Sequence, residues 1–505
     1  MVAWNDNITP VFAFGLTTGI ALTAATQYLL TALVGNNRKQ IVEVPVPSEP
    51  LNGHSLVRKE SGILTQHTRS LLRLEKEFTV SGQRLQTLVR HMVQEMKKGL
   101  AADGHQLKMI PSFVVRRPTG NETGSVLALD LGGSNFRVCE VYLEGQGRLR
   151  MRHRKYVVGD DLKRASGRVL FDFFAEKIEG FLDEIGADKA IERNLGFTFS
   201  FPVGQPALAQ GHLLHWNKGF QCEGVVNRDV VQLLAEALNR RNLKIKVTAL
   251  VNDTVGTLIS HAYTDPQTHI GVILGTGTNA AYFERIEEIG KWTGPNETGE
   301  MVINTEWGAY CEPSVLPITP YDLALDRAST APKMQIFEKM ISGMYLGEIV
   351  RYVLLDLIST GELFKGRGSK KLDTPYNFET ANMSRIERDH SLELSDTKAV
   401  LEDILGIPTT SIGDRRVVKT VCELVGTRAA RLSAAGIAAI VTKMNRLDAC
   451  TVALDGSVFE HYPHFANRMR DALREMLGIT AENIILELGR DGSGQGAALI
   501  AAIHH

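Results

Sequence analysis

Two glycine-rich turns of similar design follow short apolar segments in this sequence. The first runs from Gly132 to Asn135 after residues 128–131, and the second runs from Gly275 to Asn279 after residues 273–274. Glycine lets backbone N–H groups approach an anion closely, because no Cβ stands in the way. Two such turns, one from each half of the chain, could therefore hold a polyphosphate between them. The alternative is a pair of tight hairpin turns that bind no ligand, and neither turn alone decides between the two.

Two aspartates stand where a carboxylate could serve proton or phosphate chemistry. Asp253 follows the largely apolar segment 247–251, which puts it at the carboxyl end of a predicted strand. There it could take a proton from a substrate hydroxyl, and the alternative is an Asx turn or a helix cap. Asp130, at the first glycine turn, could hold water molecules around Mg²⁺. The five cysteines, at positions 139, 222, 311, 422 and 450, show no metal-ligand spacing, and we expect them to be reduced thiols.

Residues 275–280 also fit the loose dinucleotide-binding pattern G-x-G-x-x-A. That pattern should open a helix, whereas residues 281–284 are predicted to form another strand. The Gly-Lys-Ser/Thr ending of a P-loop is absent from the sequence. Both of these nucleotide-binding classes are therefore disfavoured, while ATP bound by another fold stays open.

Apolar segments that end in small or acidic residues alternate with helical patterns along the chain. The predicted strands are 125–131, 195–202, 246–253, 270–275 and 451–455, and the predicted helices are 85–100, 170–185, 230–240 and 337–357. Strands buried on both faces that alternate with helices indicate an α/β fold. In such folds ligands bind at the carboxyl ends of the strands. Because each half of the chain also offers one of the two similar glycine turns, we predict two related domains that face one cleft.

The composition is that of an ordinary globular protein, with a formal net charge of -1 over 505 residues, and no excess of positive charge points to nucleic acid. The N-terminus differs, because residues 11–34 contain no charged side chain. We predict a transmembrane anchor within residues 1–40 and an extended, proline-rich linker at 41–64. Arg38 and Lys39 then place the remaining chain in the cytosol. The alternatives for the uncharged run are a cleaved signal peptide and a buried core helix.

A series of motifs spread over residues 65–502 closely resembles the motifs of the hexokinase family. They are residues 127–138, 195–202, 216–220, 251–257, 275–279, 306–308, 337–340, 426–430, 455–457 and 491–494. The form with a single catalytic unit, as in fungi, is the closest match. The resemblance implies two actin-like lobes of the ribonuclease-H type around a central cleft, the first at residues 65–262 and the second at 263–505.

The resemblance also implies two substrates, Mg-ATP and a hexose, with glucose first. It implies that Asp253 removes the proton of the sugar 6-hydroxyl, and that Lys218 and Arg137 stabilise the charge that develops on the phosphate. The residues implied for sugar binding are Ser200, Asn217, Asn252, Asn279, Glu306 and Glu338. Those implied for ATP binding are Asp130, Gly132, Gly133, Ser134, Asn135, Gly275, Thr276, Gly277, Gly456 and Ser457. No side chain is expected to bind Mg²⁺ directly.

Three stretches depart from the usual pattern of the family. Asn217 stands where threonine is usual, residues 332–335 replace Pro-Gly-Gln-Gln and so lose a glycine and an amide near the sugar, and Arg490 replaces an acidic residue near the ATP end. These departures motivate a second hypothesis, in which the chain is a membrane-anchored, catalytically weak regulator that senses sugar. In either case the anchor suits the mitochondrial outer membrane.

Overall fold

The computed structural model describes residues 68–133, 135–216, 218–294 and 299–504, all within one compact unit, Ile63–His505. The first of two large sheets has the strand order β4-β3-β2-β5-β8. Its strands are β2 (Thr123–Leu131), β3 (Asn135–Gly145), β4 (Arg148–Val157), β5 (Arg193–Phe199) and β8 (Ile245–Val251). Strands β2, β3 and β4 are antiparallel, whereas β5 and β8 run parallel to β2. The carboxyl ends of β2, β5 and β8 therefore meet at one edge of this sheet.

The second sheet repeats this plan. Its order is β1-β11-β10-β9-β12-β13. Its strands are β1 (Ile110–Pro111), β9 (Thr268–Leu274), β10 (Thr278–Arg285), β11 (Glu300–Asn304), β12 (Cys450–Asp455) and β13 (Ile484–Leu488). Three consecutive antiparallel strands are again followed by two strands parallel to the first of them. This common order confirms the two related halves that the glycine turns indicated.

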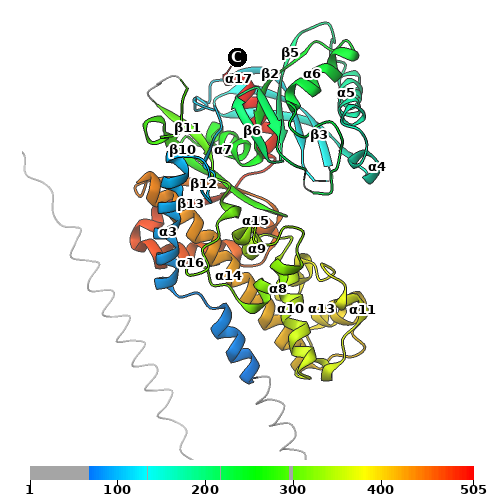
Figure 1. The fold of residues 1–505 in the computed structure, drawn as a ribbon, viewed down its shortest axis with the longest axis vertical. Coiled ribbons are helices and arrows are strands. Elements are labelled where there is room, and N and C mark those ends of the chain that lie inside the picture. Colours follow the sequence, from blue (N-terminus) through cyan, green and yellow to red (C-terminus); the bar gives the residue numbers. More distant parts are fainter. Residues whose placement is uncertain (1–67, 134, 217, 295–298, 505) are drawn as a thin grey trace, which may run out of the picture. The chain divides into compact units, whose positions relative to one another are not determined.

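Two pairs of helices cover the two faces of the first sheet. Helices α5 (Gly167–Glu184) and α6 (Val230–Arg240) pack on one face around an aromatic core. Helices α7 (Asp253–Thr264) and α17 (Gly492–Ile503) share a core with residues of both sheets. They cross closely, since a Cβ on Gly496 would lie 1.9 Å from the carbonyl oxygen of Gly256. Figure 1 shows α17, in red, beside strands that precede it by several hundred residues.

A long helix, α14 (Ile412–Met444), is the centre of the second lobe. A capping box between Ser411 and Asp414 starts it. Around it pack α3 (Gly82–Ala101), α10 (Leu346–Ser359) and α16 (Phe465–Leu477). In the part of the chain that the structure describes, α14 alone is long and apolar enough to span a membrane, but 83% of its most apolar window is buried in the protein. It is therefore a core helix.

The remaining elements are short. The helices are α4 (Asp160–Lys163), α8 (Pro320–Ala328), α9 (Ile336–Ile341), α11 (Lys370–Asp373), α12 (Thr380–Glu387), α13 (Ser395–Ala399) and α15 (Ser457–His461). Short stretches of 3₁₀ or π-helix lie at Ile286–Glu288, Trp307–Ala309, Phe364–Gly366, Val400–Ile404 and Gly478–Asn483. Strands β6 (Val203–Ala207) and β7 (Gln210–Leu213) form a separate hairpin.

Most predicted elements are present, and one prediction was wrong. The five predicted strands correspond to β2, β5, β8, β9 and β12, and residues 281–284 lie in β10 as expected. The single helix predicted over 337–357 is two helices, α9 and α10, because residues 342–345 turn toward the second glycine turn, where the N–H of Gly343 donates to the carbonyl of Gly275. The predicted anchor at 11–34 and linker at 41–64 lie outside the described residues and stay predictions.

Candidate active site

Asp253 is the first residue of α7, directly after β8. Asn252 caps the helix, because its side chain accepts a hydrogen bond from the N–H of Thr254 at 3.0 Å. The Asp253 carboxylate also accepts from that N–H, at 2.9 Å, and its other oxygen accepts from the hydroxyl of Ser200 at 3.1 Å. Asp253 therefore begins helix α7, and these hydrogen bonds also hold its carboxylate in one orientation.

Burial raises the pKa of Asp253, and the nearby carboxylate of Asp130 acts in the same direction. Lys218, the hydroxyl of Ser200 and the N–H of Thr254 act against this rise. A carboxylate with a raised pKa is a better proton acceptor than an ordinary aspartate, provided that it is still ionised at the working pH.

Lys218 lies beside this carboxylate on a loop with an unusual backbone. Its φ angle is 53°, in the left-handed region, and its ammonium donates to the carbonyl of Ser200 at 2.6 Å. The ammonium also lies 5.4 Å from the centre of the Phe201 ring. A Cβ on Gly133 would lie 3.7 Å from the Lys218 side chain, so the lysine reaches from the neighbourhood of Asp253 to the first glycine turn.

Asn279 and Glu306 form a polar cluster together with Asn304, which the sequence analysis missed. The amide of Asn279 donates to Asn304 at 2.7 Å and to Glu306 at 3.1 Å, and the amide of Asn304 donates to Glu306 at 2.8 Å. Asn304 ends β11, two residues before Glu306. The alternation of side chains along a strand was the one signal that could have linked the two residues.

Glu338 joins the second glycine turn to the same region. Its carboxylate accepts from the N–H of Thr278 at 3.0 Å. Burial raises the pKa of Glu338, and the negative charges of Glu306 and Asp253 add to the rise. These two charges act on Glu338 because the three carboxylates are gathered in one region.

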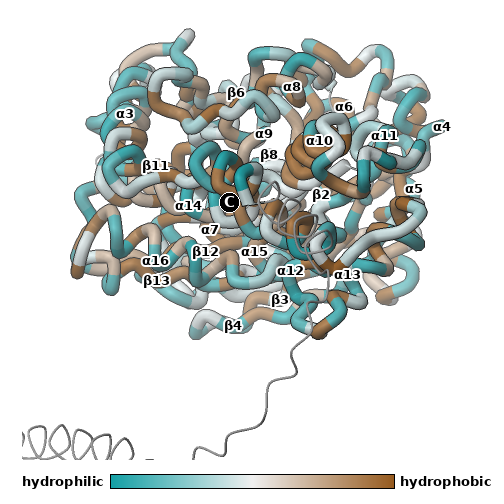
Figure 2. The backbone as a smooth tube through the Cα atoms, turned by 90° about the horizontal axis from the view of Figure 1, so that it is seen from below, coloured by the Kyte–Doolittle hydropathy of each residue, from teal (hydrophilic) through white to brown (hydrophobic). Residues whose placement is uncertain are grey.

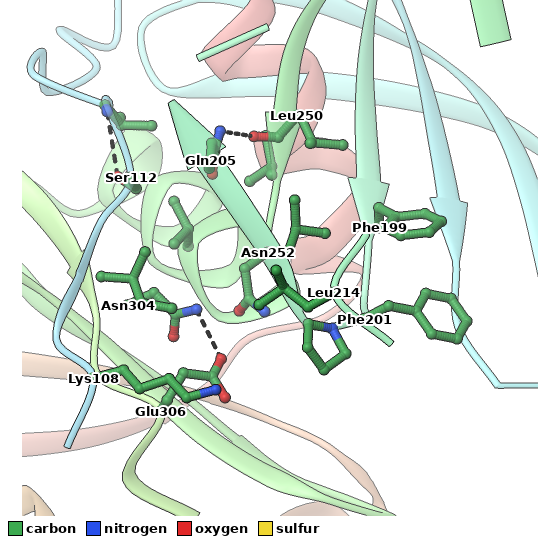
Figure 3. Close-up of a pocket in the computed structure, with 16 residues that line it drawn as sticks. Lys108, Ser112, Phe199, Phe201, Gln205, Leu214, Leu250, Asn252, Asn304 and Glu306 are labelled. Carbon is green, nitrogen blue, oxygen red and sulfur yellow. Dashed lines mark hydrogen bonds between the residues drawn. The ribbon is translucent and has the colours of Figure 1, made fainter. Parts of the chain in front are cut away.

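A cavity of about 150 Å³ borders this cluster. Figure 3 shows Asn304 and Glu306 on one side of it, and Asn252 near them. Its other walls are mainly apolar and come from β5, β6, β8 and β1. Side chains of both lobes thus line a single space.

A hydrogen bond within each glycine turn closes it, and the second turn contacts the Asp455–Ser457 turn. The N–H of Gly132 donates to the carbonyl of Asn135, and that of Gly275 donates to the carbonyl of Gly277. Gly456 has a φ of 117°, and a Cβ there would lie 2.5 Å from the carbonyl carbon of Leu274. Only glycine fits at this contact between β12 and the second turn. The N–H of Met344 donates to the carbonyl of Thr276, so the segment between α9 and α10 also holds the second glycine turn in place.

Arg137 is bound to carboxylates. It donates to Asp130 and to Asp491 at 2.5 Å and 2.7 Å, and Ser493 donates to Asp130 at 2.8 Å. Although burial disfavours its charged form, Asp130 and Asp491 raise the pKa of Arg137. In this arrangement the guanidinium ties β2 to the start of α17. Its predicted contact with phosphate stays a prediction, as do the placements of Asn217 and Ser134, which lie outside the described residues.

Family models described as hexokinase match residues 70–263 and 269–503. The chain belongs to the hexokinase family. It is 45% identical to hexokinase-1 of Spinacia oleracea over 437 residues, which is 83% of this chain and 88% of that protein. It is 43% identical to the hexokinase of Kluyveromyces lactis over 442 residues, which is 85% of this chain and 91% of that protein.

A solved hexokinase from Schistosoma mansoni, complexed with glucose, has the same fold. The TM-score is 0.81 at 39% sequence identity, and the match covers 87% of this chain and 99% of that one. The match includes almost all of the Schistosoma mansoni hexokinase, so that protein folds without a counterpart to the part of this chain that lies outside the match. The expected two-lobed, actin-like kinase fold is confirmed for the residues that the structure describes.

Proposed function

We propose that this hexokinase-family chain transfers the γ-phosphoryl group of Mg-ATP to the 6-hydroxyl of a hexose, with glucose as the first candidate. The observation that carries the proposal is the link between Asp253 and Lys218 through Ser200. The hydroxyl of Ser200 donates to Asp253 and its carbonyl accepts from Lys218. One residue therefore holds a proton acceptor and a cation together beside the first glycine turn.

The proposed reaction is an in-line displacement. Asp253 takes the proton of the 6-hydroxyl as the sugar oxygen forms a bond to the γ-phosphorus. The bond between that phosphorus and the bridging oxygen of ADP breaks, and ADP leaves with the electron pair. Lys218 and the N–H groups of the glycine turns stabilise the charge on the transferred group. Mg²⁺ bound to ATP would neutralise part of the phosphate charge, and Asp130, which also accepts hydrogen bonds from Arg137 and Ser493, would hold its water molecules.

The sugar would bind to the polar cluster across from Asp253. A hexose has several adjacent hydroxyls, and each needs a partner when it is buried. Asn252, Asn279, Glu306 and Glu338 offer amide donors and carboxylate acceptors within one region. Carboxylates are strong acceptors for hydroxyl groups, which favours a polyol over an apolar substrate.

Two of the departures from the family pattern, at residues 332–335 and at Arg490, disturb the site less in the structure than the sequence alone indicated. The side-chain oxygen of Gln335 lies 2.6 Å from the place that a Cβ on Gly308 would take, so an amide does stand near the Glu306 turn. Arg490 has a side chain that is 78% exposed, and it lies 3.9 Å from Glu460. Both observations favour an active enzyme over a weak regulator.

The test is glucose-dependent release of ADP by the full chain with Mg-ATP, compared with Asp253→Asn. Asparagine keeps the shape but cannot take the proton, so we expect turnover to fall by a factor of about 10² to 10⁴ while glucose still binds. Asp265→Asn, at the other end of α7, is the matched control and should leave turnover unchanged. A folded wild-type protein that binds glucose without turnover would instead support the sugar-sensing regulator.

A further inference from the structure

Strand β4 has the sequence RLRMRHRKYV and carries no acidic residue. Four arginines stand at alternate positions, and all of them are exposed: Arg148, Arg150, Arg152 and Arg154. Because side chains alternate between the two faces of a strand, these arginines line one face over about 20 Å. The whole chain has a net charge of only -1, so the positive charge is concentrated locally. We call these four residues the arginine ladder.

The ladder is accessible because β4 is the edge strand of the first sheet. Figure 2 shows β4 at the margin of the described part of the chain. The side chains of Arg150 and Arg154 are 77% and 56% exposed. No described strand pairs with the outer side of β4.

Local partners neutralise the ladder only in part. Arg150 pairs with Glu144, and Arg154 pairs with Glu184. Exposed ion pairs of this kind contribute little to stability and are easily exchanged. Arg152 lies over the ring of Tyr142 at 5.1 Å, and Arg148 donates to Gln146 at 3.1 Å. Neither Arg148 nor Arg152 has an ion-pair partner among the residues that the structure describes.

We propose that the arginine ladder docks on an anionic phospholipid surface. Guanidinium groups bind phosphate through paired hydrogen bonds, and a row of them suits an array of phosphate headgroups. Arg152 already covers the ring of Tyr142, the aromatic side chain beside it. A site for single-stranded nucleic acid would instead offer free aromatic rings for base stacking.

The choice of a lipid surface also rests on the predicted anchor. Sixty-seven residues precede the described chain, and residues 11–34 among them carry no charge. At roughly 3.3 Å per extended residue, the predicted 24-residue linker at 41–64 could span about 80 Å. A linker of that length would allow the described part of the chain to turn β4 toward a bilayer that holds the anchor.

The test uses residues 63–505, so that the predicted anchor does not contribute to binding. Sedimentation with vesicles of phosphatidylcholine alone is compared with vesicles that also contain phosphatidylserine. An arginine near an anionic leaflet contributes about 1 kcal/mol, or about fivefold in partitioning. The double variant Arg148→Gln/Arg152→Gln keeps both ion pairs of the ladder. We expect it to lose about 25-fold in partitioning to the anionic vesicles, and we expect wild-type binding to weaken as salt is added.

The matched control is Arg327→Gln/Arg416→Gln, which removes two exposed arginines that have no ion pair with a described residue. It should bind vesicles as the wild type does, and both double variants should keep wild-type phosphorylation of glucose. An equal loss in the control would show a general charge effect and overturn the proposal. Binding to neutral vesicles alone, to no vesicle, or to RNA in preference to anionic vesicles would also overturn it.

Discussion

Asn304 should be a positioning residue for the sugar site, although it was not predicted from the sequence. It is 7% exposed and lies between Asn279 and Glu306, with hydrogen bonds of 2.7 Å and 2.8 Å. In Asn304→Ala both bonds are lost, and Glu306 keeps only the 3.1 Å bond from Asn279. We therefore expect the carboxylate of Glu306 to lose its fixed direction toward the sugar.

The magnitude follows from the charge on Glu306. A hydrogen bond to a charged group contributes about 1.5–3 kcal/mol. Because one donor to Glu306 remains, the lower end applies, which corresponds to about a tenfold fall in kcat/KM for glucose. Asn304→Asp should be worse than the alanine variant, since it places a second carboxylate beside Glu306 and removes the donor. A purely structural role would order the two variants the other way, because aspartate conserves the volume.

The assay is steady-state phosphorylation of glucose, with glucose affinity measured by calorimetry and folding checked by thermal unfolding. Asn483→Ala is the control, because it also removes one amide hydrogen bond, to the carbonyl of Leu447, just before β13 at the opposite edge of the second sheet from β11. If Asn304→Ala changed kcat/KM by less than about twofold, or if the aspartate variant matched the wild type, the positioning argument would be refuted.

Three further changes test other parts of the reasoning. Ser200→Ala removes a hydrogen bond that opposes the raised pKa of Asp253, so the acidic limb of the kcat/KM profile, below which the base is protonated, should move up by as much as about one pH unit. If the acidic limb did not move, its pKa would belong to a group other than Asp253. Gly456→Ala forces a side chain into a φ of 117°. We expect a higher KM for ATP and a loss of about 1–3 kcal/mol in unfolding free energy, and an unchanged KM would remove this turn from the nucleotide site. Arg428→Met leaves the buried carboxylate of Asp322 without its cation and should cost about 3–5 kcal/mol of stability; adding Asp322→Leu should restore part of it, and no restoration would contradict the ion-pair explanation.

Strand positions and glycine turns could be predicted because each depends on local sequence. A buried parallel strand is apolar along its whole length, and a polar residue such as Asp253 after β8 marks its carboxyl end, where ligands bind in such sheets. The break between α9 and α10 could not be predicted. It depends on a hydrogen bond from Gly343 to Gly275, 68 residues earlier in the chain. Periodic apolar residues on both sides of the break continue one helical pattern, so the sequence favours a single helix.

The predicted role of Arg137 shows a second limit of reasoning from motifs. The motif predicts an arginine near the phosphates of ATP. It does not show which carboxylates of the protein already pair with the charge of that arginine before ATP binds. Asp491, 354 positions away, supplies one of the two carboxylates that hold this guanidinium. A contact of such sequence separation exists only after α17 has packed on the first sheet.

The packing of α17 also bears on the predicted boundary between the lobes. A division at residues 262 and 263 follows the repeat of the two sheets, yet α17 comes from the end of the chain and packs against β2 and β5. Conversely α3, from the start of the described chain, packs against α14 of the second lobe. Each lobe thus completes its core with a helix from the other end of the chain. The two lobes therefore pack together through these helices. One example is the hydroxyl of Thr198 on β5, which donates to the carbonyl of Ser493 on α17 at 2.9 Å and so joins the first sheet to the end of the chain.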